Sequence, residues 1–148
     1  MFSFHELFHV LVALPNEQTI CLPIKLAMET QIIETTALID YGATGNFIDI
    51  DLLSKANFPL QHLSKLIQAY NVDGTANIKG MIRWKAHTDI LFPQSRENTD
   101  LMVLSLGQQQ VILGMLWLHK WNPRIDWLVN TVSIPKSPVS PPPGYLPQ

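Results

Sequence analysis

The segment Ala37-Leu38-Ile39-Asp40-Tyr41-Gly42-Ala43-Thr44-Gly45 decides how the rest of the chain is interpreted. It begins as an apolar strand, reaches a carboxylate at Asp40 and then turns at Gly42. A carboxylate at the end of a hydrophobic strand is costly to bury unless it is paired or hydrogen-bonded. Asp40 is therefore either a well-satisfied turn residue or an acid that takes part in chemistry.

Composition limits the classes of protein to consider. The chain has 148 residues, so we expect one domain of ordinary size. Hydrophobic residues make up 47% and charged residues 15%, which leaves a weakly charged surface of the kind that meets a partner. The net charge of −2 gives no electrostatic footprint for nucleic acid. No apolar run approaches the ~20 residues needed to span a bilayer, so we expect no membrane partner.

The cellular location is predicted from the cysteine content and the N-terminal segment. A single cysteine, Cys21, cannot build a disulfide framework and is compatible with a reducing compartment. The first residues lack the basic region and the small-residue cleavage site of a signal peptide. We therefore expect an intracellular protein, either cytoplasmic or nuclear.

The periodicity of apolar residues predicts a chain made mostly of strands. Alternation and short apolar runs indicate strands at residues 19–28, 32–39, 63–72, 81–92, 101–106, 111–114, 124–128 and 131–134. Pro23 should place the first of these at a sheet edge or a bulge. Residues 93–99 look like a polar loop, and short helices are expected at 3–14, 48–56 and 115–121. Asp49 and Asp51 should be solvated at the start of the second helix.

Apart from the helix in the leader, these elements predict an all-β fold, a small barrel or sandwich with one or two short helices. Three regions are expected: a leader with a short helix at 1–18, the folded domain at 19–135, and a proline-rich extended tail at 136–148.

The leader contains His5-Glu6-Leu7-Phe8-His9, which matches the zinc pattern H-E-x-x-H. On a helix this spacing lets His5 and His9 share a zinc ion while Glu6 acts as a base. However, the match lies at the extreme N-terminus, and no downstream motif supplies a third ligand. A chance match is the preferred interpretation, so no metal or cofactor is expected. A zinc hydrolase stays as the third alternative.

Three features follow one another in an order that is more specific than any of them alone. They are a strand followed by an Asp-x-Gly loop, a hairpin flanked by glycines, and an apolar-apolar-Gly strand before a short helix. They resemble the retropepsin-like aspartic proteases (peptidase A2), and most closely the protease of fungal gypsy-type LTR retrotransposon polyproteins. The resemblance is carried by residues 37–49, 71–75, 111–118 and 121–127.

The resemblance implies a small acid-protease barrel that is completed by homodimerisation and acts on a peptide or polyprotein. An aspartic protease needs two carboxylates about 3 Å apart that share one proton. This chain has one Asp-x-Gly after an apolar strand, because Asp73-Gly74 lies in the predicted hairpin. The second carboxylate must then be Asp40 of another copy, across an isologous interface.

The resemblance also assigns roles to individual residues. Asp40 would be catalytic, and its loop would be supported by Tyr41, Gly42, Ala43 and Thr44. The hairpin would form a flap over an extended substrate, with contacts from Val72, Asp73, Gly74, Thr75, Ile78 and Gly80. Packing behind the Asp40 loop would come from Ile112, Leu113 and Gly114.

Two positions depart from the family pattern. Tyr41 stands where the family has Ser or Thr, whose small hydroxyl forms hydrogen bonds across the dimer, and a phenol ring needs more volume there. Leu116 stands where the family usually has proline. Two alternatives remain open: an active aspartic endopeptidase, or a catalytically inactive module that dimerises or binds extended peptide.

Overall fold

The fold is built almost entirely from strands. The computed structural model describes residues 8–11, 19–28, 30–70 and 76–138, without the side chains of 8–11, 19 and 76–79. The strands are β1 (Phe8–Leu11), β2 (Thr19–Met28), β3 (Gln31–Asp40), β4 (Asn46–Asp49), β5 (Gln61–Tyr70), β6 (Ala76–Phe92), β7 (Ser95–Leu104), β8 (Val111–Leu113), β9 (Arg124–Asp126) and β10 (Thr131–Ser133). The helices are α1 (Ile50–Lys55) and α2 (Met115–Trp121).

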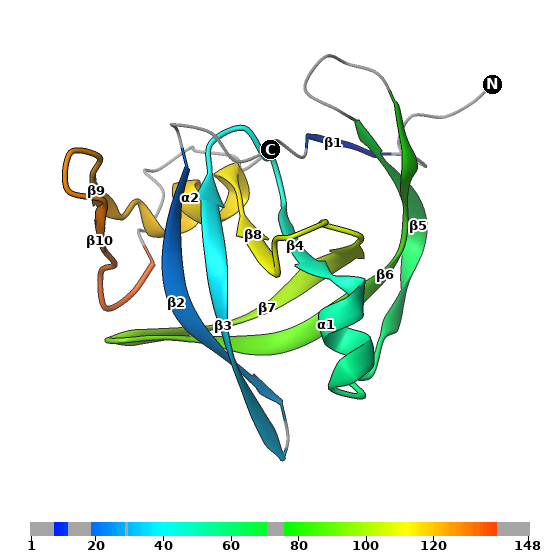
Figure 1. Cartoon of the computed structure of the whole chain (residues 1–148), viewed down its shortest axis with the longest axis horizontal. Helices are drawn as coiled ribbons and strands as arrows, with labels where there is room; N and C mark the ends of the chain where they lie inside the picture. The colour runs from blue at the N-terminus through cyan, green and yellow to red at the C-terminus, as the bar shows by residue number, and fades with distance from the viewer. Residues whose placement is uncertain (1–7, 12–18, 29, 71–75, 139–148) are drawn as a thin grey trace, which may run out of the picture.

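The main sheet curls into a barrel. Its strands lie in the order β1-β5-β6-β2-β3-β8-β4-β7, and β7 also pairs with β6. This last pairing closes the strands from β6 round to β7, whereas β5 and β1 extend the sheet beyond β6 (Figure 1). β9 and β10 form a separate hairpin that follows α2 in the chain. The prediction of an all-β barrel with short helices is confirmed.

The burial of β3 explains how the end of this strand is held. In its first half exposed and partly buried side chains predominate, whereas every side chain from Ala37 to Asp40 is buried. Ala37 and Ile39 belong to the larger hydrophobic cluster, and Leu38 belongs to a second one. Since successive side chains of a strand point to opposite faces, both faces of the strand end are covered. Asp40 therefore sits at the most firmly packed end of β3.

Helix α2 is fixed to the hairpin that β6 and β7 form. Trp117 and Trp121 are buried, and their rings lie 5.7 and 5.9 Å from the ring of Phe92 at the end of β6. Lys120 Nζ lies 2.5 Å from an Oε atom of Glu97 in β7, whose side chain is buried. Apolar packing and one ion pair thus set the position of the helix.

Strand β2 lies between β3 and β6, so it is not the edge strand that Pro23 suggested, but Pro23 stands on a part of it with one neighbour. This residue pairs with Thr36 of β3, whereas β2 pairs with β6 only from Lys25 to Ala27. Proline has no N–H to donate and is tolerated where a strand has a neighbour on one side only. The strand predicted at 19–28 has these same bounds in the structure.

The predicted helix at 3–14 is wrong where the structure describes it. Residues 8–11 form β1, which runs parallel to β5 with Phe8 opposite Ile67. A short isolated helix is marginal in water, and backbone pairing with a sheet edge prevails over it. Residues 1–7 and 12–18 of the predicted leader, and 139–148 of the predicted tail, lie outside the described residues.

The predicted helix at 48–56 is also wrong at its beginning. Residues 46–49 form β4, which pairs with β7 and β8, and the helix starts only at Ile50. Asp49 is buried rather than solvated, since it accepts hydrogen bonds from the N–H groups of Asp51 (3.2 Å) and Leu106 (2.8 Å). Two backbone donors offset the cost of burying its carboxylate.

The predicted polar loop at 93–99 is largely a strand. The chain turns at Pro93 and Gln94, and β7 then pairs with β6 without interruption from Ser95 to Met102. Its polar composition suggested a loop, but exposed strand positions also carry polar side chains.

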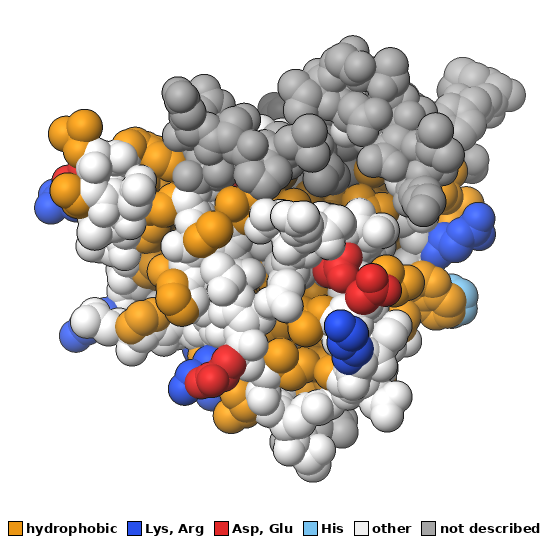
Figure 2. Space-filling view, viewed as in Figure 1, with side chains coloured by type: hydrophobic (Ala, Val, Ile, Leu, Met, Phe, Trp, Pro, Cys, Tyr) orange, Lys and Arg blue, Asp and Glu red, His pale blue; other side chains and the backbone are white. Residues whose placement is uncertain are grey.

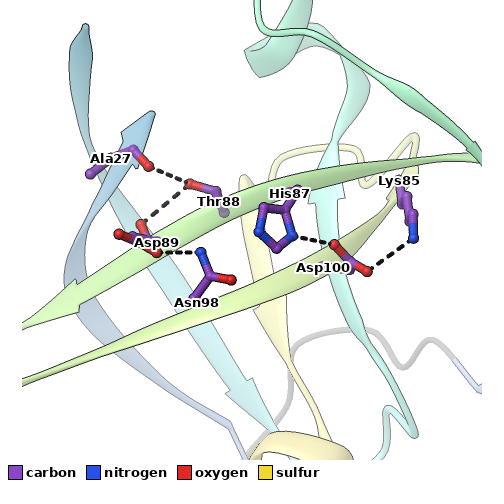
Figure 3. Close-up of polar contacts among 7 residues, drawn as sticks. All are labelled: Ala27, Lys85, His87, Thr88, Asp89, Asn98 and Asp100. Carbon is purple, nitrogen blue, oxygen red and sulfur yellow. Dashed lines mark hydrogen bonds and ion pairs between the residues drawn. The ribbon is translucent and has the colours of Figure 1, made fainter. Parts of the chain in front are cut away.

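Polar pairs along the outer face of β6 and β7 reinforce this ladder (Figure 3). Asp100 bonds both Lys85 Nζ at 3.1 Å and His87 Nδ1 at 2.6 Å. Further along, Asn98 donates to Asp89 at 2.6 Å, and hydrogen bonds from Asn98 and Arg96 lower the pKa of the Asp89 carboxyl. Cross-strand pairs of this kind stabilise antiparallel strands.

The visible surface carries few charges. Figure 2 shows Lys, Arg, Asp and Glu side chains in a few small groups separated by hydrophobic and uncharged surface on this face. In the part of the chain that the structure describes, no helix has the length and apolar character needed to cross a bilayer.

Candidate active site

Asp40 lies at the last position of β3, opposite Thr19 of β2. Its side chain is 0% exposed. The N–H of Gly42 donates to Asp40 Oδ1 at 2.8 Å, and the N–H of Ala43 donates to the Asp40 carbonyl at 3.2 Å. Asp40 Oδ2 has no hydrogen-bond partner among the described residues. One carboxylate oxygen is thus held by the turn, and the other lacks the partner that a buried oxygen normally has.

This environment favours the neutral form of the acid. Burial raises the pKa of the Asp40 carboxyl above its ordinary value of 3.8, and the hydrogen bond from Gly42 only partly opposes that shift. Desolvation disfavours the charged form of any carboxyl group. Two acids that share one proton require that one of them stays protonated, and a raised pKa favours this.

The raised pKa predicts how the stability of the single chain depends on pH. A raised folded-state pKa contributes stability that is fully present below pH 3.8 and is lost as the pH rises through the folded pKa. Asp40→Asn is similar in shape and cannot ionise. We expect it to be more stable than wild type at pH 7, with a difference that shrinks as the pH approaches 3.8. Urea unfolding at each pH, at protein concentrations too low for dimers, measures this.

The control for that experiment is Glu34→Gln, on the same strand. The Glu34 side chain is 80% exposed and lies 3.7 Å from Lys25 Nζ. Exposed ion pairs contribute little to stability, so this variant should follow wild type across the range. A stability difference for Asp40→Asn that does not change with pH would contradict the assignment of a raised pKa.

The loop after Asp40, residues 41–46, is fastened to the start of α2. The N-cap of this helix is Gly114, which has no side chain to cap it, so its first N–H groups need other acceptors. The loop supplies them through three hydrogen bonds: Met115 N–H to Ala43 O (2.8 Å), Leu116 N–H to Thr44 O (3.1 Å) and Gly114 N–H to Asn46 Oδ1 (3.1 Å). We call these three hydrogen bonds the loop–helix clasp.

Strand β8 brings Gly114 to the loop. Ile112 and Leu113 are buried and pair in parallel with Leu38 and Ile39 of β3, so β8 ends next to Asp40. A Cβ on Gly114 would lie 2.4 Å from the carbonyl oxygens of both Ala43 and Gly45. Only glycine allows this approach of two backbone segments. The structure therefore places Ile112, Leu113 and Gly114 directly beside the Asp40 loop.

Tyr41 is accommodated by turning toward its own chain. Its side chain is 44% exposed, and its ring lies 5.5 Å from the ring of Trp127, with 41° between the planes. Trp127 follows β9 in the small C-terminal hairpin. This contact could not be predicted from the sequence, because no local pattern links two residues so far apart.

The predicted flap falls mainly on residues that the structure does not describe. Val72, Asp73, Gly74 and Thr75 lie outside the described residues, and Ile78 is placed in β6 without its side chain. Gly80 is described and buried in β6, at a shift in register between β5 and β6. The flap therefore remains a prediction.

Gly42 supports the Asp40 loop through its N–H, without an unusual backbone conformation. Among the described glycines a positive φ occurs at Gly107 (67°), not at Gly42, so the turn after Asp40 does not require left-handed backbone. The glycine whose lack of a side chain matters most at this site is Gly114. Sequence reasoning also missed Asn46. No sequence pattern indicates that its amide oxygen accepts a hydrogen bond from Gly114, which is distant in the chain.

The zinc alternative loses its geometric basis at His9. This residue lies in the strand β1, whereas the motif requires a helix. His5 and Glu6 lie outside the described residues. Within ranges 8–11, 19–28, 30–70 and 76–138, no three His, Cys, Asp or Glu side chains gather as metal ligands do.

A hollow of about 410 Å³ lies at the other end of the β2–β3 hairpin from Asp40. Met28 and Gln31 line it from the hairpin turn, and His87, Asp89 and Asn98 line it from β6 and β7. As Figure 3 shows, Asn98 already bonds Asp89, and His87 bonds Asp100. The hollow is separate from the Asp40 site.

Comparison with protein families agrees with this geometry. A family model described as the PEG10/RTL1 protease domain matches residues 36–139, more than half of the chain. The matched range begins just before Asp40 and includes the Asp40 loop, β8, α2 and the C-terminal hairpin. The chain therefore belongs to the PEG10/RTL1 protease domain family, within the retropepsin-like aspartic proteases.

Proposed function

We propose that this chain is an aspartic endopeptidase that acts as a homodimer and cleaves the polyprotein of a gypsy-type LTR retroelement, of the fungal kind that its motifs resemble. Membership of a protease family supports the activity. The observation that carries the proposal is Asp40 itself, a buried carboxyl at a strand–turn junction with one oxygen unpartnered among the described residues. An intracellular location goes with this proposal, since Cys21 fits a reducing compartment.

The proposed chemistry uses two copies of Asp40 that share one proton. The ionised carboxylate takes a proton from a water molecule, whose oxygen attacks the carbonyl carbon of the peptide bond. The protonated carboxyl donates its proton to the carbonyl oxygen, which gives a tetrahedral diol. The carboxyl that took the proton of the water donates it to the amide nitrogen, and the other carboxylate takes a proton from the diol. The C–N bond then breaks, which releases the two peptides and leaves one proton shared by the pair.

Exposed apolar side chains near the Asp40 loop support a second copy as the partner. Tyr41, which follows Asp40, and Leu116, whose N–H bonds the loop, are 44% and 56% exposed. Beside Tyr41, the hairpin tip adds Trp127, Leu128 (94% exposed) and Val129 (64% exposed). Clustered apolar surface of this kind marks interaction sites. An isologous interface would cover it on both copies.

The direct test uses a peptide-like inhibitor that mimics the tetrahedral intermediate. We expect one inhibitor to bind per two chains and to shift the chain from monomer to dimer in sedimentation. The Asp40→Asn variant should lose this binding, whereas Glu34→Gln should keep it. Binding of one inhibitor per chain, or equal binding to Asp40→Asn, would contradict the proposal.

The second candidate is a catalytically inactive module that dimerises or binds extended peptide. The contact between Tyr41 and Trp127 favours it, because the side chain that replaces Ser or Thr is engaged within its own chain. In that case peptide would bind without being cleaved.

Tyr41→Ser distinguishes the two candidates. Serine restores the small hydroxyl and removes ring volume beside the dyad, so we expect faster cleavage per chain. It also loses the ring contact with Trp127, which should cost about 1 kcal/mol of folding stability. Initial rates and urea unfolding measure the two effects.

Tyr41→Phe is the matched control, because it keeps the ring and removes only the hydroxyl. It should cleave no faster than wild type. If Tyr41→Ser and Tyr41→Phe cleave at the same rate, the size of the ring at position 41 does not limit activity.

A further inference from the structure

We propose that Asn46 is a positioning residue for Asp40, because its side-chain amide oxygen fastens the Asp40 loop to the start of α2. This inference rests on the proposed function for its activity readout only. Asn46 is 5% exposed, and its Oδ1 accepts the N–H of Gly114 at 3.1 Å.

Asn46 is the member of the loop–helix clasp that a side chain provides. The other two hydrogen bonds join backbone atoms, from Met115 and Leu116 to the carbonyls of Ala43 and Thr44. Substitution can therefore remove the Asn46 bond and leave the backbone groups in place. The chain thus offers a way to loosen the clasp without changing any residue that carries the carboxylate.

The clasp holds the same loop that holds Asp40. Ala43, whose carbonyl oxygen accepts from Met115, donates its own N–H to the Asp40 carbonyl at 3.2 Å. Its neighbour Gly42 donates to Asp40 Oδ1 at 2.8 Å. A shift of Ala43 would therefore move both N–H groups, of Gly42 and Ala43, that hold Asp40. A displacement of about 1 Å in a catalytic group can lower the rate on the order of 100-fold.

The far side of the clasp is rigid. Helix α2 is fixed by buried Trp117 and Trp121 and by the ion pair between Lys120 and Glu97. Because the helix cannot follow the loop, loss of the Asn46 bond should move the loop rather than the helix.

The test compares two substitutions that keep the number and branching of the side-chain heavy atoms. Asn46→Leu keeps the branched outline and the number of heavy atoms, although its methyl groups are bulkier, and removes the acceptor. Asn46→Asp keeps an oxygen that can accept the Gly114 N–H. We expect Asn46→Leu to lower kcat about 100-fold with little change in KM. Asn46→Asp should recover most of that loss at its own optimum pH. Asn98→Leu, which changes an exposed amide on β7, is the control and should leave kcat unchanged.

Two measurements do not depend on turnover and separate this inference from the proposed function. In Asn46→Leu, hydrogen exchange should quicken at the Met115 and Leu116 amides, which lose their firm acceptors. The carboxyl of Asp40, followed by NMR, should also titrate closer to 3.8 as water enters. These changes would support the inference even if the wild type cleaves nothing.

The inference is overturned if Asn46→Leu leaves hydrogen exchange and the Asp40 titration as they are in wild type. It is also overturned if Asn46→Asp and Asn46→Leu lower kcat equally, since a packing effect would then explain both.

Discussion

Asp40→Asn is expected to abolish peptide cleavage, with a loss of at least about 10⁴-fold, while the chain still folds and dimerises. Asparagine has nearly the same shape but can neither take a proton from water nor share one with a partner. Both copies of the dimer lose their acid at once, so neither acid nor base catalysis survives. Initial cleavage rates at acidic pH measure the loss, and circular dichroism and sedimentation establish that fold and dimer are intact.

Mixing experiments make this prediction sharper. If a dimer needs two intact copies of Asp40, equal amounts of wild type and Asp40→Asn leave about one quarter of the dimers competent. The rate should therefore fall with the square of the wild-type fraction at constant total protein. A rate that falls linearly would mean that each chain works alone, and equal rates for variant and wild type would remove Asp40 from the chemistry.

Much of the fold could be predicted because the local signals and the final packing agree. β2 shows clear alternation, β8 is a short apolar run, and β3 and α2 were also predicted from local sequence; each has the predicted character in the structure. Asp40 could be singled out for the same reason, since an acid that ends an apolar run demands an explanation. The resemblance to the retropepsin-like proteases then placed Ile112, Leu113 and Gly114 beside the loop.

The errors arise where long-range pairing prevails over local pattern. Phe8–Leu11 lies within a segment predicted to be helical but pairs with β5. Asn46–Asp49 overlaps the predicted start of a helix but forms β4 between β7 and β8. Ser95–Asp100 is polar and still forms a strand, because β6 provides a continuous partner. None of these partners can be identified from a window of neighbouring residues.

The details of the site were missed for a related reason. Asn46 acts through Gly114, and Tyr41 packs against Trp127, so each contact joins residues that are distant in sequence. Gly114 was predicted to pack behind the loop, but the reason that it must be glycine appears only when the loop carbonyls are placed against it.

Gly114→Ala is the second substitution with a large expected effect. The added methyl would lie 2.4 Å from the carbonyl oxygens of Ala43 and Gly45, and 2.8 Å from the carbonyl carbon of Ala43. These are backbone atoms that the clasp and β8 hold in place, so no side chain can rotate to make room. We expect a loss of about 3 kcal/mol in the free energy of unfolding, together with loss of activity.

Two other glycines provide matched controls. Gly45→Ala meets the terminal methyl of Met102 at 2.5 Å, the far end of a flexible side chain, so repacking should make it milder. Gly107 has a φ of 67° with nothing within 4 Å, so Gly107→Ala should cost only about 1 kcal/mol of backbone strain. Urea unfolding of the three variants should rank Gly114→Ala as the least stable. If Gly114→Ala is instead no less stable than Gly107→Ala, the loop can move away from α2 at little cost. The loop–helix clasp then does not hold the Asp40 loop rigidly.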